Sequence, residues 1–278
     1  MNASDENLQP AYMSVLNHVA TVTINRPEAM NAIDPETSER LSGFWKEIRD
    51  NDDIWVAVVT GTGGKAFCAG ADLKKAIPRG QTDNPSQPFK SQGIPSLDDG
   101  FELWKPVIAA VDGYCLGAGM TLLSACDIRI ASTTSSFGLP EVKRGIVPTL
   151  GATQRFPRQL PWSTALEMLL LGDMFGAEDA LRYGLINQVV DSSEVMGTAM
   201  NYATRLTTEV APLTTRAIKE AAIRSQSLSL EEGIRLERLL SNHVNRTDDA
   251  KEGPRAFAEK RPPAYSCLLY TSDAADEG

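Results

Sequence analysis

The chain has 278 residues, of which 42% are hydrophobic and 23% charged, a composition typical of one large globular domain or slightly more. The net charge is −9, and because Lys and Arg are scattered among the acids rather than gathered into a stripe, we expect no nucleic-acid surface. The longest apolar runs fall far short of the ~18 residues of a membrane span, and the acidic N-terminus lacks the pattern of a secretion signal, so we expect a cytoplasmic protein with no membrane partner.

The first half of the chain alternates β-rich runs with helical or glycine-rich segments. Alternating or continuous apolar runs predict strands at 19–25, 54–61, 106–113 and 127–132. The spacing of apolar residues predicts an amphipathic helix at 35–51. Strand, turn and helix in this order favour an α/β fold in which crossover connections join the strands and helices cover the sheet.

Residues 78–100 interrupt this pattern. The segment has 23 residues, four of them proline and three glycine, and no usable period. Loops longer than ~12–15 residues are usually functional covers or disordered segments. We predict a variable loop that covers the active site, with disorder as the alternative.

The second half of the chain is mainly helical. A short strand is predicted at 186–190, and helical patterns then continue from about 196 to 260. We therefore divide the chain into an α/β core at 1–195 and a C-terminal helical region at 196–266.

Residues 267–278 differ from the rest of the chain. The stretch CLLYTSDAADE follows a natural-looking ending and can be back-translated into the end of a common transposase sequencing adapter. We interpret this segment as a translated adapter, with a genuine acidic tail as the alternative. Removing its three acids, Asp273, Asp276 and Glu277, changes the net charge from −9 to −6.

Histidine and cysteine are too sparse for several kinds of catalytic site. The two histidines, His18 and His243, lie near opposite ends of the chain, which argues against a Ser–His–Asp triad and a histidine-rich metal site. The four cysteines, at positions 68, 115, 126 and 267, show no CxxC spacing. We read them as small apolar residues or free thiols in a reducing compartment, and we expect no metal site.

Two glycine turns follow predicted strands, and each opens a helix. Gly70 lies in KAFCAGADLKKA, and Gly117 and Gly119 lie in CLGAGMTLLSACD. The first amides of a helix lack intrahelical partners, so such a turn can hold negative charge. Two amides that converge on one oxygen form an oxyanion hole, where removing one donor costs ~10²–10³ in rate. One such glycine is more often a packing feature, but two in this order favour a shared catalytic cleft.

From about residue 19 to residue 260 the sequence resembles the enoyl-CoA hydratase/isomerase family, the crotonase superfamily. The resemblance is carried, in order, by INRPEAMNAI, AFCAGADL, VDGYCLGAGMTLLSACDIRIAS, FGLPEVKRGIVPTLGATQR, GAEDALRYGLINQVV and DDAKEGPRAFAEKR. It implies an α/β spiral of ββα units, a helical C-terminal region that forms trimers or dimers of trimers, and acyl-CoA substrates. It also implies an enolate stabilised by two backbone amides, with no cofactor beyond the CoA of the substrate.

The resemblance also implies roles for individual residues. The oxyanion hole would be formed by the amides of Ala71 and Ala118, where alanine replaces the family's usual second glycine but keeps the N–H. The two catalytic glutamates of the hydratases fall at Thr121 and Glu141. The residues implied to line the CoA path are Arg26, Ala69, Ala71, Asp72, Leu73, Lys74 and Ala118, together with Phe257 and Lys260 toward the CoA of a neighbouring subunit.

Several of these assignments have a plainer reading. Lys74 and Lys260 also fit solvated surface charges, Phe257 fits a core aromatic, and Arg26 fits a residue that ends a strand. Glu141, placed after a proline, also fits a surface acid, but the flanking motif favours the catalytic role.

Thr121 is the main departure from the family pattern. A threonine hydroxyl can hydrogen-bond a water but cannot take its proton near neutral pH, so Glu141 is expected to be the single acid–base group. The loop Thr149–Ala152 also departs, because its side chains are larger than the glycines common there. We therefore favour an isomerase-type shift of a double bond, with hydration by Glu141 and Thr121 as one alternative and a non-catalytic CoA-binding protein as another.

Overall fold

The computed structural model describes residues 9–76 and 96–267. Residues 78–95 of the predicted covering loop, and residues 268–278 of the predicted adapter segment, lie outside the described residues. The end of the predicted loop, residues 96–100, is described. It contains a short 3-10 helix, η2 (Leu97–Asp99), and Leu97 belongs to the main hydrophobic core.

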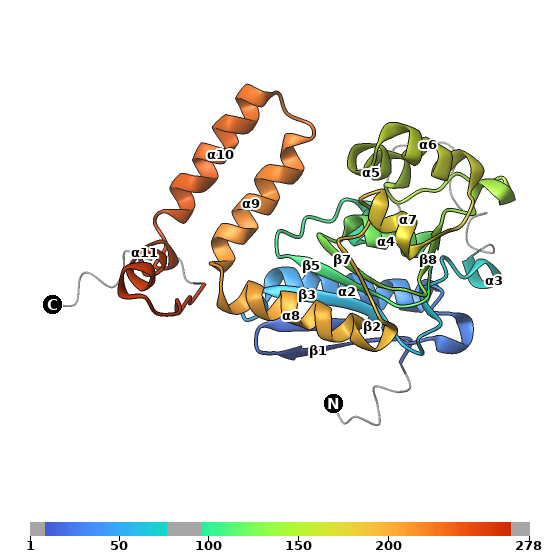
Figure 1. The fold of residues 1–278 in the computed structure, drawn as a ribbon, viewed down its shortest axis with the longest axis horizontal. Helices are drawn as coiled ribbons and strands as arrows, with labels where there is room; N and C mark the ends of the chain where they lie inside the picture. The colour runs from blue at the N-terminus through green and yellow to red at the C-terminus, as the bar shows by residue number, and fades with distance from the viewer. Residues whose placement is uncertain (1–8, 77–95, 268–278) are drawn as a thin grey trace.

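Two β-sheets carry the described part of the chain (Figure 1). The larger has the strand order β1-β2-β3-β5-β7-β10, and the smaller has the order β4-β6-β8-β9. In the larger sheet β1 and β2 are antiparallel, and the neighbours from β2 to β10 are parallel. The strands are β1 (Ala11–Leu16), β2 (Val19–Ile24), β3 (Val56–Gly61), β4 (Ala66–Cys68), β5 (Val107–Val111), β6 (Tyr114–Leu116), β7 (Ile128–Ser132), β8 (Ser136–Gly138), β9 (Phe175–Gly176) and β10 (Gln188–Val190).

From β3 to β8, consecutive strands alternate between the two sheets and so form ββα units. Strand β3 leads into β4 and then α3 (Leu73–Ala76), and β5 leads into β6 and then α4 (Ala118–Ala125). Strand β7 leads into β8, the 3-10 helix η3 (Val142–Arg144) and α5 (Ala152–Gln159). Parallel neighbours require crossover connections of this kind. The spiral of ββα units expected from the sequence is therefore confirmed.

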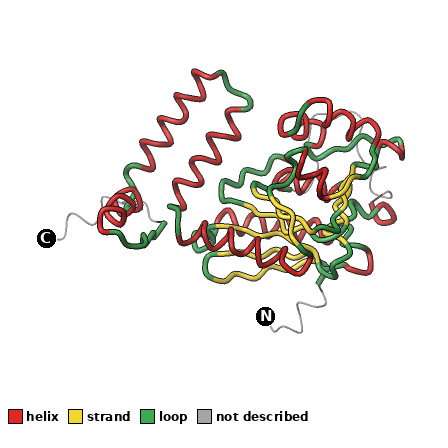
Figure 2. Tube along the Cα trace, viewed as in Figure 1, coloured by secondary structure: helices red, strands yellow, loops and turns green. Residues whose placement is uncertain are grey.

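The remaining helices surround the two sheets or extend away from them (Figure 2). In α2 the start is fixed by Asp34, whose carboxylate accepts from the Thr37 amide at 2.9 Å, and by a proline in the first turn. The helices not yet given are α2 (Pro35–Asp50), α6 (Trp162–Leu171), α7 (Ala177–Arg182), α8 (Val195–Thr208), α9 (Pro212–Ser225), α10 (Leu230–Val244) and α11 (Asp249–Glu259), with the 3-10 helices η1 (Pro27–Ala29) and η4 (Ser192–Glu194).

Both faces of the larger sheet are buried, as parallel sheets require. Along β3 the side chains alternate between two hydrophobic clusters. Val56 and Val58 pack with Ala199 and Ala203 of α8, whereas Ala57 and Val59 face the main core, which also holds residues of α2 and of the smaller sheet. The smaller sheet is thus held against a rigid scaffold.

The C-terminal helices leave the body of the molecule. Helices α9 and α10 form an antiparallel hairpin that projects beyond the larger sheet, and α11 lies at the far end from α3 (Figure 1). A capping box starts α10, because Ser229 accepts from the Glu232 amide and the Glu232 carboxylate accepts from the Ser229 amide. The helical region predicted at 196–266 is therefore present, with large apolar side chains exposed on it.

Candidate active site

Three short strands of the smaller sheet end at one edge and position the candidate site. Strands β4, β6 and β8 are parallel neighbours in that order. The carboxyl ends of parallel neighbours lie side by side, so the residues that follow them meet. The first glycine turn follows β4, the second follows β6, and Glu141 follows β8.

The first turn is fixed by a short bridge to the segment before α2. Gly70 has φ +106°, a conformation that favours glycine. The Ile33 amide donates to the Gly70 carbonyl at 2.8 Å, and the Asp72 amide donates to the Ile33 carbonyl at 2.9 Å. The intervening Ala71 amide has no backbone acceptor within the described residues. It is therefore available to a bound oxygen.

The second turn supplies the start of α4. Gly117 has φ +53° and precedes the first helical residue, Ala118. The Gly117 amide donates to the Gly138 carbonyl of β8 at 3.0 Å, which joins this turn to the strand before Glu141. A Cβ built on Gly70 would lie 3.7 Å from the Ala118 nitrogen. The two turns are therefore in contact, with the Ala118 amide at the free N-terminal end of a helix.

Glu141 lies against the second turn. A Cβ built on Gly117 would lie 2.9 Å from Glu141 Oε1. Oε2 is buried and has no hydrogen-bond partner among the described residues. Burial raises the pKa of the Glu141 carboxyl, and Arg144 opposes that shift only in part. A carboxyl whose pKa is raised keeps its proton to higher pH than an exposed glutamate does, which favours a role as proton donor in acid–base catalysis.

These residues line a single cavity of about 260 Å³. Six of the residues predicted from the sequence contribute to it: Ala69, Ala71, Leu73, Ala118, Thr121 and Glu141. The other walls are mainly apolar, with Ile146, Val147 and Leu150 opposite the turns. Among the described residues that line this cavity, Glu141 and Arg144 are the charged ones. The cavity thus combines two turn amides with one buried carboxyl.

Thr121 has a charged neighbour that the sequence analysis missed. Its Oγ1 lies 2.6 Å from Asp98 Oδ2, and Asp98 is 3% exposed. Burial raises the pKa of the Asp98 carboxyl, and hydrogen bonds from Ser96 and Thr121 lower it in part. The sequence contains only an indirect signal for the role of Asp98. A threonine at a position where the family pattern has a glutamate invites a search for another acid, but η2 lies in a segment without periodicity.

The other predicted CoA residues lie outside the cavity. Arg26 is buried, and its Nη2 lies 3.0 Å from Asp72 Oδ2 and 3.4 Å from Asp34 Oδ2. This ion-pair cluster holds the first turn, whereas Lys74 is exposed on α3. Phe257 and Lys260 lie on and after α11, at the far end of the molecule from α3 (Figure 1). They do not reach the cavity of their own chain.

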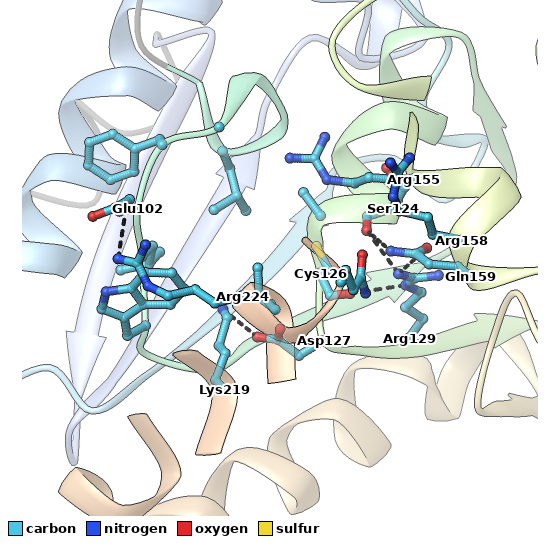
Figure 3. A pocket seen from close by; sticks show the side chains of 18 of the residues that line it. Glu102, Ser124, Cys126, Asp127, Arg129, Arg155, Arg158, Gln159, Lys219 and Arg224 are labelled. Atoms are coloured by element: carbon cyan, nitrogen blue, oxygen red, sulfur yellow. Dashed lines mark hydrogen bonds and ion pairs between the residues drawn. The ribbon is translucent and has the colours of Figure 1, made fainter. Parts of the chain in front are cut away.

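A second, larger cavity of about 750 Å³ lies between α9, η2 and the end of α5 (Figure 3). Its most buried cation, Arg129, donates to the carbonyls of Cys126, Leu185 and Ser124. Lys219 and Arg224 pair with carboxylates, at 2.7 Å from Asp127 and 3.1 Å from Glu102. These cations are engaged within the protein, and no glycine turn opens a helix there. The smaller cavity is the better catalytic candidate.

The described residues offer neither a cluster of metal ligands nor a membrane-spanning helix. No group of three or more His, Cys, Asp or Glu side chains in that part of the chain is arranged to hold a metal ion. No helix described in the structure combines the length and the apolarity needed to cross a membrane.

Comparison with known proteins decides the family. The model of the family described as enoyl-CoA hydratase/isomerase matches residues 15–267. The chain belongs to this family. A curated relative, (E)-benzylidenesuccinyl-CoA hydratase of Thauera aromatica, is 45% identical over 256 residues, which cover 92% of this chain and 98% of the relative. Carnitinyl-CoA dehydratase of Proteus mirabilis is 40% identical over 261 residues, with the same two coverages.

Solved structures agree with this assignment. The crystal structure of an enoyl-CoA hydratase from Mycobacterium tuberculosis has a TM-score of 0.84 at 33% identity and covers 93% of this chain and 99% of its own. That of an enoyl-CoA hydratase from Bacillus anthracis has a TM-score of 0.85 at 32% identity and covers 94% and 100%. The resemblance seen in the sequence is confirmed. This member of the enoyl-CoA hydratase/isomerase family is an enzyme of acyl-CoA thioesters.

Proposed function

We propose that the enzyme catalyses the reversible addition of water across the C2–C3 double bond of a 2-enoyl-CoA. The observation that carries the proposal is the buried, unpaired carboxyl oxygen of Glu141 in the cavity that also receives the Ala71 and Ala118 turns. The related proteins named hydratase and dehydratase support this direction of chemistry. From the sequence alone we favoured isomerisation, with hydration as an alternative. Here hydration is the preferred reaction.

The chemistry follows from where charge develops. Water adds to C3, and negative charge moves onto the thioester oxygen as an enolate. The amides of Ala71 and Ala118 stabilise this oxygen by two hydrogen bonds, in a cavity whose apolar walls strengthen them. Protonated Glu141 then gives its proton to C2. The reaction uses no cofactor beyond the CoA that the substrate carries.

Double-bond isomerisation remains a second candidate because of one specific observation. Glu141 is the sole carboxylate among the described residues that line the cavity. A single group of this kind suffices to remove a proton from one carbon of a 3-enoyl-CoA and return it to another. Hydration needs a different set of proton transfers, with a base for the water and an acid for C2.

One assay separates these functions. A short 2-enoyl-CoA and the matching 3-enoyl-CoA are supplied to the same enzyme preparation at equal concentration. We expect hydration of the 2-enoyl-CoA to be the faster reaction. Faster transposition of the 3-enoyl-CoA would contradict the proposal in favour of isomerisation, and tight thioester binding without either reaction would favour a non-catalytic CoA-binding protein.

Arg144 also suggests which class of acyl group the enzyme accepts. It lines the cavity, where its Nη1 donates to the Pro140 carbonyl at 2.9 Å and its charge acts on the Glu141 carboxyl. A succinyl thioester, as in the name of the Thauera aromatica relative, keeps a second carboxylate. We propose that Arg144 binds a carboxylate on the acyl group, because a guanidinium matches that group in shape and charge.

This assignment is tested by substrate preference. Arg144→Leu removes the cation, and Arg144→Lys keeps the charge but not the planar fork. A hydrogen bond to a charged group contributes ~1.5–3 kcal/mol, so we expect Arg144→Leu to lower kcat/KM for a dicarboxylate monothioester by ~10–100-fold. Turnover of a neutral 2-enoyl-CoA should change much less, because it loses only the effect of the Arg144 charge on the pKa of Glu141. Equal losses on both substrates would refute a role in acyl recognition.

A further inference from the structure

We propose that Asp98, acting through the hydroxyl of Thr121, accepts the proton of the attacking water during hydration. Asp98 is then a positioning residue that acts through its hydrogen bond with Thr121. Together the two side chains replace, as the base for water, the glutamate that the family pattern has at position 121. The inference rests on the proposed hydration, and its test is chosen so that the two fail in different ways.

The geometry places Asp98 one hydrogen bond away from the cavity. Thr121 lies in the first turn of α4, directly after the Ala118 turn, and contributes to the cavity wall. Its Oγ1 is 2.6 Å from Asp98 Oδ2. Asp98 itself does not line the cavity. A proton can therefore reach the Asp98 carboxylate from the cavity through the Thr121 hydroxyl, without contact between Asp98 and the substrate.

Both oxygens of the Asp98 carboxyl accept hydrogen bonds. The Ser96 hydroxyl donates to Oδ1, and the Thr121 hydroxyl donates to Oδ2. The Arg155 guanidinium of α5 donates to the Asp98 backbone carbonyl at 2.5 Å. The two side-chain bonds fix the direction of the carboxyl, and the Arg155 bond fixes the backbone that carries it.

The Thr121 hydroxyl has one hydrogen and two acceptors. Its Oγ1 lies 2.9 Å from the Ala118 carbonyl as well as 2.6 Å from Asp98. When the hydrogen points to Asp98, the oxygen keeps lone pairs that can accept a hydrogen from water in the cavity. A threonine without an acid behind it could accept that hydrogen bond but could not take the proton.

The proton transfers balance over one turnover. At the start Glu141 is protonated and Asp98 is ionised. The water oxygen bonds to C3 as its proton passes to Thr121 Oγ1 and the Thr121 proton passes to Asp98, while Glu141 protonates C2. At the end Asp98 is protonated, Glu141 is ionised and the product is a 3-hydroxyacyl-CoA. A proton exchanged through water resets the two carboxyls.

The surroundings make Asp98 a stronger base than an exposed aspartate. Burial raises the pKa of its carboxyl, so its ionised form gains more by taking a proton. The charged and titratable groups that interact with it are the Arg155 guanidinium from α5 and the buried thiols of Cys68 and Cys126. Arg155 favours the ionised form, which limits the rise.

Four variants test the relay. Asp98→Asn keeps the shape and one oxygen that can accept from Thr121, but it cannot take a proton, and Asp99→Asn makes the same change at the exposed neighbouring residue. Thr121→Val removes the hydroxyl at similar volume, whereas Thr121→Ser keeps it. We expect Asp98→Asn and Thr121→Val to lower kcat for hydration of a short 2-enoyl-CoA by ~10²–10⁴-fold, and Asp99→Asn and Thr121→Ser to keep most of it.

A second reaction separates loss of the relay from loss of the site. Exchange of the C2 hydrogen of a saturated acyl-CoA in D₂O needs the turn amides and Glu141 but no attacking water. We expect Asp98→Asn to keep this exchange while losing hydration. Full hydration by Asp98→Asn, or parallel loss of both reactions, would overturn the relay. Exchange without hydration in the unmodified enzyme would instead overturn the proposed function.

The buried Asp98 carboxyl also predicts how the thermal stability of the protein depends on pH, which can be measured without an activity assay. Because the pKa of Asp98 is raised in the fold, its neutral form stabilises the protein below the pKa of an unfolded aspartate, ~4, and this contribution is lost as pH rises through the raised value. The Tm of the unmodified protein should therefore fall relative to Asp98→Asn as pH rises above ~4. A constant Tm difference would contradict the assigned environment.

Discussion

Glu141 combines burial with a free oxygen because of where β8 ends. The strand finishes beside the second glycine turn, the next residues place the carboxyl against Gly117, and Oε2 is left without a partner among the described residues. A surface glutamate after a proline would be hydrated and would keep an ordinary pKa. The raised pKa of Glu141 thus follows from its position in the fold.

Glu141→Gln should abolish turnover with little effect on binding. The amide keeps the size of the side chain but cannot exchange a proton, and acid–base groups contribute ~10²–10⁴ in rate. We expect kcat for hydration to fall by about that factor while the Kd of a saturated acyl-CoA, measured by calorimetry, changes little. Glu167→Gln on the exposed face of α6 is the control. Retained turnover would show that another carboxyl acts.

Gly117→Ala tests the contact between the turn and the carboxyl. A Cβ at this position would lie 2.9 Å from Glu141 Oε1, and φ is +53°. We expect a stability loss of ~1–2 kcal/mol from the backbone and a loss of kcat from displacement of Glu141. Gly184 also has a positive φ, +77°, with open space around the new Cβ in Gly184→Ala. It should lose stability, measured by urea unfolding, but keep kcat, and equal kcat in both variants would refute the contact.

At the scale of elements, one carboxyl joins the start of α2 to the first turn. Asp34 caps α2 through Thr37 and receives Lys75 Nζ at 2.7 Å and Arg26 Nη2 at 3.4 Å. Burial alone would raise the pKa of Asp34, but the hydrogen bonds from Lys75 and Thr37 hold it well below its usual range. The folded state therefore gains stability from ionised Asp34 above the pKa of an unfolded aspartate and loses it as pH falls.

Asp34→Ala should destabilise the protein by about 2–4 kcal/mol near neutral pH. The loss combines a helix cap with removal of a partner from a buried cation. The destabilisation should shrink as pH falls below ~4, because the unmodified protein then progressively loses the stability that it gains from ionised Asp34, whereas the variant has no such contribution to lose. Glu36→Ala breaks an exposed pair with Arg40 at 3.9 Å and should cost less than 1 kcal/mol. Urea unfolding at several pH values checks both, and equal losses would contradict the buried cluster.

The sequence predicted the larger sheet better than the smaller one. The strand predicted at 19–25 is observed as Val19–Ile24, and the helix predicted at 35–51 as Pro35–Asp50. Strands β4, β6 and β8 were not predicted, because three residues are too few to show a period of two. These are the strands that position the site, so its residues were found from the family pattern and not from periodicity.

Asp98 shows a second limit of sequence reasoning. Its segment is rich in proline and glycine, so nothing in the local pattern indicated that η2 is buried against the core. Long-range packing of η2 on α4 brings Asp98 to Thr121, 23 positions away. Such a pair depends on tertiary contacts that no local pattern encodes.

At the scale of the whole molecule, the C-terminal helices expose apolar side chains that a folded monomer would leave in water. Leu230 is 81% exposed, Leu239 68% and Phe257 87%. Exposed apolar surface of this kind marks interaction sites. The family resemblance implies contact with other copies of the chain, which would also bring Phe257 and Lys260 to a neighbouring subunit's CoA.

We therefore expect a trimer or a dimer of trimers. Light scattering should give three or six times the chain mass of 30.1 kDa. Leu239→Asp should weaken the assembly, because it places a charge on the exposed apolar face of α10, whereas Leu16→Asp on the exposed part of β1 should not. A mass of about 30 kDa for the unmodified protein would contradict this expectation.

The most direct test of the catalytic assignment is a crystal structure with a bound acyl-CoA. We expect the thioester oxygen to lie ~2.7–3.1 Å from the amide nitrogens of both Ala71 and Ala118. We also expect C2 to face Glu141 and C3 to face the side of the cavity formed by Thr121. A thioester bound in the larger cavity beside Arg129, or a carbonyl that points away from the two turns, would contradict the catalytic assignment.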